Sequence, residues 1–169
     1  FDTYINNPSV YDSLLSLKRN GLISKVGFSL YYPEQLQKIF NDNIEVDLIQ
    51  IPYNLFDRRF EKYFAKLKER NVEIHIRSIF LQGLFFMQPE ELPQKLNGFS
   101  KYLSILKKLS GNLKLTIHEL ALLFVVSNPL IDKAVIGIDN INHLKDIIKV
   151  LSDENKSKLI DSHRNILSE

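Results

Sequence analysis

Short apolar runs alternate with amphipathic, helix-like segments along this chain. Four runs are predicted to be strands, and each has a small or polar residue at its end or next to it: residues 25–29, 46–51, 72–78 and 134–137. Strands that stay apolar on both faces and alternate with helices are typical of a parallel sheet covered by helices. In such sheets the ligand site lies at the carboxyl ends of the strands. The pattern therefore directs the search for function to Ser29, Gln50, Arg77, Ser78 and Gly137.

Helix signals fill the segments between these strands. Asn7 as the N-cap and Pro8 at the first helical position predict a helix that ends at Asn20-Gly21. Thr116 and Glu119 have the spacing of a capping box at the start of a strongly apolar helix. The other predicted helices begin at Pro33 or cover residues 60–70, 100–109, 141–151 and 153–167.

Four β-then-α units after a leading helix fit two architectures. One is a small open sheet of the flavodoxin kind, and the other is half of an eight-stranded barrel. Periodicity alone does not separate them. A lone half barrel would carry two unpaired apolar strand edges, which favour association with further sequence or with a partner. The chain begins at Phe1 rather than Met, so we expect it to be processed or to belong to a longer polypeptide.

The composition narrows the class of protein only broadly. With 169 residues, 44% of them hydrophobic, residues 1–169 are expected to form a single unit with one core. A net charge of +2, with both signs interspersed, argues against nucleic acid or an anionic membrane as a partner. No apolar run approaches the roughly 20 residues of a membrane-spanning helix. The absence of cysteine fits a cytoplasmic protein without disulfides.

The histidines and glycines do not form a known catalytic or metal-binding motif. The four histidines lack metal-ligand spacing, so no metal site is expected. We assign His118 to the helix start and His75 to the core or to a helix-facing position. His143 begins a helix after the Gly137 turn, where an anionic group could bind. The isolated glycines Gly27 and Gly137 are interpreted as sites of close packing near strand ends.

Arg77 is the most informative single residue at the predicted sheet edge. A charge at the end of an apolar strand is costly unless it is paired or hydrogen-bonded. Ser78 follows it, and Gln50 of the preceding strand has a side chain that both donates and accepts hydrogen bonds. We therefore predict that Gln50, Arg77 and Ser78 form a ligand-binding set.

At these strand ends the chain resembles the aldo-keto reductases, NAD(P)H-dependent enzymes with an eight-stranded α/β barrel. Residues 25–29, 49–55, 77–84 and 137–144 are similar, in this order, to the family's segments from the fifth strand to the turn after the eighth. The resemblance covers nearly the whole chain. It implies an α/β fold that is the C-terminal half, strands five to eight, of a (β/α)8 TIM barrel.

The resemblance also implies roles for individual residues toward NADP or NAD. Ser29 and Gln50 would hydrogen-bond the nicotinamide carboxamide. Arg77 would lie against the nicotinamide ring, where the family usually stacks a tyrosine. This replacement would mark a subgroup whose contact with the ring or redox preference is altered. The implied contacts along the diphosphate and the adenosine phosphates are Ser78, Phe80, Gln82, Gly137, Asp139, Asn140 and His143.

Two positions depart from the family pattern. Leu30 stands where an asparagine usually helps to hold the carboxamide. Residues 137–140 contain no lysine or arginine, where tight NADPH binders often place basic residues, and Asp139 would repel the 2′-phosphate. We therefore expect weak discrimination for NADP, or a preference for NAD.

The family's catalytic Tyr, Asp, Lys and His belong to its first four strands, so this chain is expected to contain no catalytic residue. The parent enzyme would reduce an aldehyde or ketone, a small-molecule carbonyl substrate, whereas this chain alone is expected to be inactive. Its expected partner is the N-terminal half of the barrel, or a second copy bound through exposed strand edges. The rival hypotheses are a non-catalytic homologue that binds or regulates and a free-standing flavodoxin-like binding domain.

Overall fold

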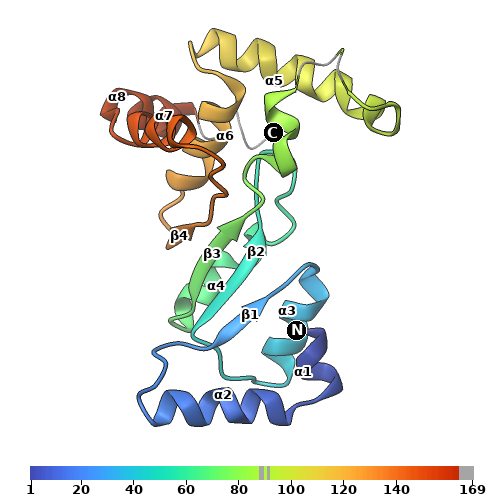
Figure 1. Cartoon of the computed structure of the whole chain (residues 1–169), viewed down its shortest axis with the longest axis vertical. Helices are drawn as coiled ribbons and strands as arrows, with labels where there is room; N and C mark the ends of the chain where they lie inside the picture. Colours follow the sequence, from blue (N-terminus) through green and yellow to red (C-terminus); the bar gives the residue numbers. More distant parts are fainter. Residues whose placement is uncertain (88–89, 91, 164–169) are drawn as a thin grey trace.

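The centre of the fold is a four-stranded parallel sheet (Figure 1). The computed structural model describes residues 1–87, 90 and 92–163. The strands lie side by side in chain order, and a flavodoxin-like sheet would instead place its first strand between the second and third. The flavodoxin-like arrangement is therefore excluded for these strands, which are β1 (Gly27–Ser29), β2 (Leu48–Pro52), β3 (Glu73–Arg77) and β4 (Lys133–Ala134).

All four predicted strands are present, but each is shorter than the apolar run that predicts it. Asp47 precedes β2, and its carboxylate accepts hydrogen bonds from the Val26 backbone N–H at 2.8 Å and Lys18 Nζ at 2.7 Å. These side-chain bonds add to two backbone bonds at that end of the sheet, from the Asp47 N–H to the Val26 carbonyl at 2.8 Å and from the Glu73 N–H to the Asp47 carbonyl at 2.9 Å. The strand predicted over residues 134–137 stops after Ala134, because beyond Val135, whose N–H donates to the Ile76 carbonyl at 2.7 Å, the chain leaves the sheet.

The N-terminal helices differ from the prediction at their start. A short helix precedes Asn7, and the next one begins at Ser9, so Asn7 ends the first helix instead of capping the second. The segment predicted as one helix over residues 60–70 divides into a 3-10 turn and a short α-helix. The helices of this part are α1 (Asp2–Asn6), α2 (Ser9–Arg19), α3 (Pro33–Asn41), η1 (Glu61–Tyr63) and α4 (Phe64–Glu69).

The C-terminal helices gather beyond one end of the sheet (Figure 1). The capping box is confirmed, since Thr116 Oγ1 accepts from the Glu119 N–H at 3.3 Å and Glu119 Oε2 accepts from the Thr116 N–H at 2.8 Å. Residues 164–167 of the last predicted helix lie outside the described residues. The elements are η2 (Leu81–Phe86), η4 (Gln94–Phe99), α5 (Ser100–Asn112), α6 (Ile117–Val126), α7 (Ile141–Leu151) and α8 (Glu154–His163).

Within the part of the chain that the structure describes, no single helix is long and apolar enough to cross a membrane. One bent pair, residues 94–112 with residues 117–126, passes the same test by length and composition only. Within this pair, the apolar side chains of α6 from Leu120 to Val125 are buried in the core, as the sequence predicts.

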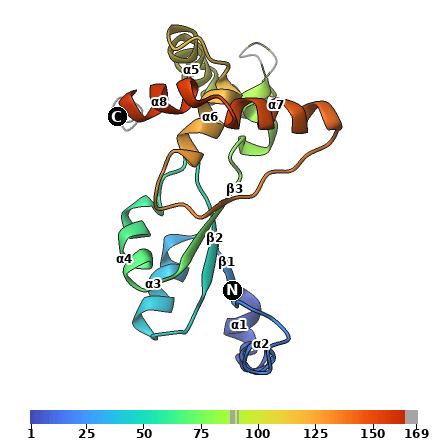
Figure 2. The same ribbon diagram turned by 90° about the vertical axis from the view of Figure 1, so that its left-hand side faces the viewer.

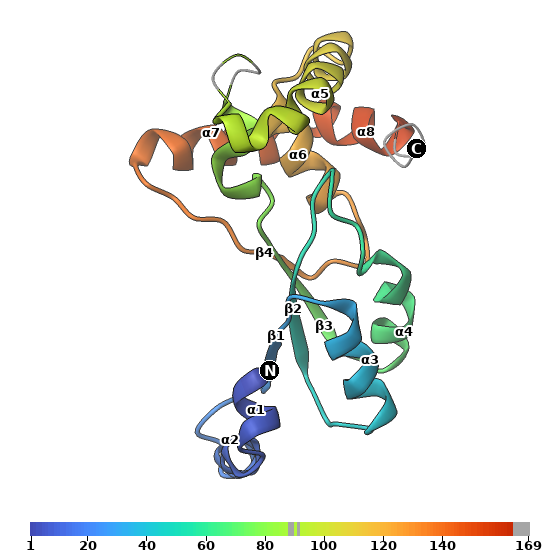
Figure 3. The ribbon, with the colours of Figure 1, turned by 90° about the vertical axis from the view of Figure 1, so that its right-hand side faces the viewer.

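One face of the sheet is covered by helices and the other is not (Figures 2 and 3). Ile49, Ile51, Ile74 and Ile76 are fully buried in one cluster with apolar residues of α3 and α4. Both of these helices lie on that side of the sheet. The opposite face carries a row of side chains in register, and it is not covered by any helix among the described residues: Ser29, Gln50, His75 and Lys133.

His75 therefore does not face the helices, so the helix-facing interpretation of it is wrong. Its Nε2 lies 3.0 Å from Glu73 Oε2, on the face of β3 opposite Ile74 and Ile76. Parallel sheets are normally covered on both faces. Among the described residues, this parallel sheet is covered by helices on one face only and carries a polar row on the other.

Candidate functional site

The carboxyl edge of the sheet carries a hydroxyl and an amide side by side. Ser29 ends β1 and lies opposite Gln50 of β2, and Ser29 Oγ donates to Gln50 Oε1 over 3.3 Å. Ser29 is exposed and Gln50 is half-buried. An amide in this position can present a donor and an acceptor together, which is the pattern that a carboxamide ligand requires.

Arg77 ends β3 at the same edge, and the rest of the site fixes the plane of its guanidinium. The guanidinium carbon lies 4.3 Å from the centroid of the Tyr31 ring, and Nη2 donates to the Leu30 carbonyl at 3.0 Å. Nη1 contacts Ser78 Oγ at 3.4 Å. Nε is buried without a hydrogen-bond partner. The expectation that this charge must be hydrogen-bonded is confirmed, although one of its donors remains unused.

The turn after β3 is held in an unusual backbone conformation. Ser78, Leu81 and Gln82 have φ angles of 63°, 47° and 53°, and Gly83 has φ 91°. Residues other than glycine rarely adopt this left-handed region, and such conformations cluster at functional sites. Fully buried Asn54 holds the turn, because its Nδ2 donates to the Ser78 carbonyl at 3.1 Å.

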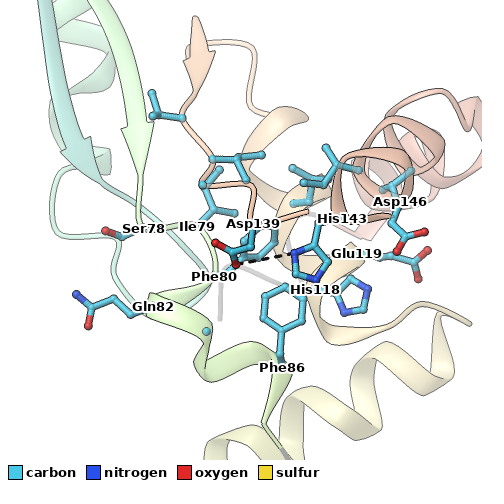
Figure 4. Close-up of a pocket in the computed structure, with 17 residues that line it drawn as sticks. Ser78, Ile79, Phe80, Gln82, Phe86, His118, Glu119, Asp139, His143 and Asp146 are labelled. Carbon is cyan, nitrogen blue, oxygen red and sulfur yellow. Dashed lines mark ion pairs between the residues drawn. The ribbon is translucent and has the colours of Figure 1, made fainter. Parts of the chain in front are cut away.

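Next to this turn lies a cavity of about 610 Å³ (Figure 4). Its walls come from the β3–η2 turn with η2, from α6, from the segment that joins β4 to α7, and from α7 itself. Most of the lining is apolar. Six of the ten predicted cofactor residues line it: Ser78, Phe80, Gln82, Gly137, Asp139 and His143.

The other four predicted residues lie outside the cavity lining. Ser29, Gln50 and Arg77 lie along the sheet edge. Asn140 caps α7, because its Oδ1 accepts from the backbone N–H groups of Asn142 at 2.9 Å and His143 at 3.0 Å. The strand-end residues and the cavity residues thus form two adjacent parts of one edge, and Ser78 connects them.

The two isolated glycines differ in how closely other atoms pack against them. A Cβ on Gly27 would lie 1.8 Å from the Leu48 carbonyl oxygen, so the close packing predicted there is confirmed. A Cβ on Gly137 would meet nothing within 4 Å. Close packing within the chain therefore does not explain Gly137, which instead leaves its side of the cavity open.

An aromatic stack at one end of the cavity was not predicted (Figure 4). The Phe86 ring stacks on His118, with centroids 5.1 Å apart, and lies 6.5 Å from the His143 ring at an interplanar angle of 13°. The sequence assigned His118 to the helix start, but Thr116 and Glu119 perform the capping, so the His118 ring is left to line the cavity. Burial lowers the pKa of His118 below its ordinary value.

The remaining ionisable groups of the cavity are mostly acidic. Glu119, Asp139 and Asp146 line it, and Asp139 Oδ2 lies 4.0 Å from His143 Nδ1. Burial alone would raise the pKa of Glu119, but hydrogen bonds from Lys156 and Thr116 outweigh burial and lower it. No group of three or more potential metal ligands was found in the described part of the chain.

Three comparisons with known proteins relate this geometry to a family. The model of the aldo/keto reductase family matches residues 2–165. The uncharacterized oxidoreductase YqkF of Bacillus subtilis (strain 168) is 22% identical over 173 residues, which cover 94% of this chain and 56% of that protein.

Solved structures show a similar fold. Aldo-keto reductase AKR11C1 from Bacillus halodurans superposes with a TM-score of 0.70 at 22% identity, covering 89% of this chain and 54% of that one. The glycerol dehydrogenase AKR11B4 from Gluconobacter oxydans gives a TM-score of 0.55 at 21% identity, covering 82% and 52%. The chain thus spans little more than half the length of these relatives. Because the family model matches nearly every residue, the chain belongs to the aldo/keto reductase family and has that family's type of α/β fold.

Proposed function

We propose that this chain is the C-terminal half of an NAD(P)H-dependent aldo-keto reductase and supplies much of its cofactor-binding wall. The observation that carries the proposal is that the predicted cofactor residues follow one another along the carboxyl edge of the sheet. Ser29 and Gln50 form a hydrogen-bonded pair there, and the edge continues through Ser78 into a cavity that six predicted cofactor residues line.

The uncovered sheet face supports the half-barrel part of the proposal. The strands β1 to β4 are parallel and lie in chain order, as consecutive barrel strands do, and the relatives are almost twice as long. The outer edges of β1 and β4 have no strand partner among the described residues. In the proposed enzyme the N-terminal half of the barrel covers the open face and pairs with both edges. Self-association would use the same edges.

The residues present fit a nicotinamide dinucleotide. The Ser29–Gln50 pair matches a carboxamide, and the apolar cavity with its stacked rings suits an adenine-sized aromatic base. When bound, the cofactor supplies the hydride that reduces a carbonyl carbon. The chain's own residues then bind and orient the cofactor.

Three features pre-organise these contacts. Tyr31 and the Leu30 carbonyl hold the Arg77 guanidinium in one plane. Asn54 fixes the left-handed turn at Ser78. The buried side chains behind the cavity keep water from its inner wall, which strengthens polar contacts at the rim. In this scheme the acid that protonates the carbonyl oxygen comes from the other half of the barrel.

Binding of the cofactor to the chain tests the proposal. Isothermal titration calorimetry with NADH and with NADPH is expected to show saturable binding of at least one of them with a dissociation constant below about 1 mM. No detectable reduction of an aldehyde or ketone is expected. Absence of binding of both nucleotides would overturn the cofactor role, and measurable carbonyl reduction by this chain would overturn the half-barrel assignment.

A non-catalytic homologue would keep the same cofactor wall. The two proposals differ in the other half of the barrel, where the enzyme needs its tyrosine and lysine. Restoring activity by adding the N-terminal half to this chain would support the enzyme. A mixture that binds the nucleotide and closes the barrel, yet shows no turnover, would support the non-catalytic homologue.

A further inference from the structure

A second cavity, of about 520 Å³, lies between the start of α3 and η1, on the helix-covered side of the sheet (Figure 3). Its described lining contains three cations, Arg58, Arg59 and Lys62, and one carboxylate, Glu34. The cavity of Figure 4 has the opposite character, because its described lining contains three carboxylates and no lysine or arginine. The two cavities share no lining residue, so the second is a separate candidate site for an anionic ligand.

The guanidinium of Arg59 is held in one orientation at this cavity. Its Nε and Nη2 donate to the two carboxylate oxygens of Asp57 at 2.9 and 2.8 Å. Asp57 is itself fixed, because its backbone N–H donates to Oδ1 of the fully buried Asn54 at 3.0 Å. The pair with Asp57 leaves Arg59 Nη1 to donate to a ligand, and the Arg59 side chain is 51% exposed. A guanidinium oriented in advance binds a phosphate group with little further loss of side-chain entropy.

Lys62 brings a second cation to the cavity from η1. Its Nζ lies 5.1 Å from the centroid of the Tyr63 ring, and it forms no ion pair with any residue that the structure describes. Arg58 adds a half-buried guanidinium, whose Nη1 lies 3.9 Å from Glu61 Oε2. Glu61 does not line the cavity, and α3 begins there, so the partial positive charge of a helix N-terminus adds to these cations.

The uncharged walls of the cavity are largely aromatic. The Tyr63 hydroxyl accepts a hydrogen bond from Gln37 Nε2 at 2.6 Å, which fixes the position of the ring. Tyr32 precedes α3, and its side chain is exposed. Tyrosine rings offer a flat apolar surface together with a polar hydroxyl, and the volume lies within the range of about 300–1,000 Å³ that is typical of small-molecule sites.

We infer that this cavity binds a small phosphorylated ligand, whose phosphate is held by Arg59 and Lys62 and whose organic part lies against Tyr32 and Tyr63. A phosphate monoester carries a charge of about −1.5 to −2 at pH 7, which suits two cations better than a single carboxylate group does. The site is separate from the proposed cofactor site.

A row of cations beyond the cavity suggests a different ligand class. Lys66 and Arg70 continue from Lys62 at intervals of four residues along η1 and α4, so the three lie on one face. Lys66 Nζ and the Arg70 guanidinium carbon lie 4.3 and 4.8 Å from the centroid of the Phe40 ring. Such a row would attract an acidic protein segment, but the cavity and the oriented Arg59 favour a small ligand.

Calorimetric titration of the 169-residue chain with pyrophosphate tests the inference. At about 50 mM salt we expect a dissociation constant below about 1 mM, which rises at about 0.5 M salt. The double substitution Arg59→Gln with Lys62→Gln removes two charged donors and should raise the dissociation constant by about tenfold or more. Arg19→Gln with Lys101→Gln makes the same charge change at exposed positions of α2 and α5 and should leave the affinity unchanged.

Arg59 and Lys62 are both exposed, so the double variant should keep the melting temperature of the unsubstituted chain. If it does not, the fully solvated change Lys62→Gln alone should still raise the dissociation constant by about threefold or more. Binding of NADH, which tests the proposed function, should be the same in the double variant and in the unsubstituted chain.

Four outcomes would overturn the inference. They are absence of pyrophosphate binding, equal affinity of the double variant and the unsubstituted chain, and citrate binding as tightly as pyrophosphate, since citrate has a comparable charge without phosphate. The fourth is a peptide of ten glutamates that binds more tightly than pyrophosphate and is weakened by Lys66→Gln, which would assign the surface to an acidic protein segment. None of these outcomes bears on whether NADH binds.

Discussion

Ser29 and Gln50 occupy opposite positions on neighbouring parallel strands, and the Ser29 hydroxyl donates to the Gln50 side-chain oxygen at 3.3 Å. The strand register creates this pair, because it aligns the last residue of β1 with the middle of β2. The pair holds the Gln50 amide in one orientation at the carboxyl edge of the sheet. In the proposed enzyme, the Ser29–Gln50 pair binds the carboxamide of the nicotinamide.

Replacing Gln50 should weaken nucleotide binding without unfolding the chain. Gln50→Ala removes a donor and an acceptor, each contributing about 1 kcal/mol, so the dissociation constant of the preferred dinucleotide should rise by about tenfold or more. Calorimetry measures the change. Gln94→Ala, at an exposed position of η4, should leave the affinity unchanged. An equal effect of the two substitutions would contradict the role of Gln50.

Asn54 should be essential for the turn that carries Ser78. It is fully buried, its Nδ2 donates to the Ser78 carbonyl, and its Oδ1 accepts from the Phe56 and Asp57 N–H groups. Asn54→Ala removes a fully buried side chain and its hydrogen bonds to three part-buried backbone groups, and should lower the free energy of unfolding by about 3 kcal/mol. Urea denaturation measures this loss. The exposed Asn142→Ala should cost less than about 0.5 kcal/mol, and a similarly small loss for Asn54→Ala would argue against the turn's dependence on it.

Gly27 should tolerate no side chain. An added Cβ would lie 1.8 Å from the Leu48 carbonyl oxygen and 2.7 Å from its carbon, so β1 and β2 would have to separate. Gly27→Ala should therefore destabilise the chain by about 2 kcal/mol or more. Gly111→Ala, near the end of α5 where nothing lies within 4 Å, should be neutral or stabilising by up to about 1 kcal/mol. Thermal melts of the two variants in parallel provide the comparison.

Acid should destabilise the open face through Glu73. Hydrogen bonds from Lys25 and His75 lower the pKa of Glu73 from 4.5 to about 2. Because the folded-state pKa is lower than the unfolded one, ionised Glu73 stabilises the fold above pH 4.5, and this contribution disappears as the pH falls toward 2. In the Glu73→Gln variant, the free energy of unfolding should therefore fall less between pH 4.5 and pH 2 than in the unsubstituted chain.

Melting temperatures of both proteins between about pH 5 and pH 2 measure the effect. Asp47 and Asp132 also have pKa values lowered by lysine partners and backbone N–H groups, so the variant should keep some acid sensitivity. Identical pH profiles of the two proteins would show that the Glu73 contacts do not persist in solution.

Local patterns predicted the elements because the physics that forms them is local. Thr116 and Glu119 are three residues apart, and their reciprocal hydrogen bonds start α6 as the spacing indicates. Gly27 marks a close approach that a side chain would prevent. The short helix α1 was not predicted, because its five residues carry too little periodicity. The early end of β4 was not predicted either, because the end of a strand depends on the neighbouring strand.

The sequence by itself determined the alternation of strands and helices, the polar strand ends and the resemblance to the aldo-keto reductases, since each depends on residues close together in the chain. Only the tertiary structure decided the strand order, the uncovered face that carries His75, and the cavity. The stack of Phe86 with His118 and His143 joins residues 25 or more positions apart. Periodicity encodes which side of an element is buried, but it contains no information on which distant segment packs against it.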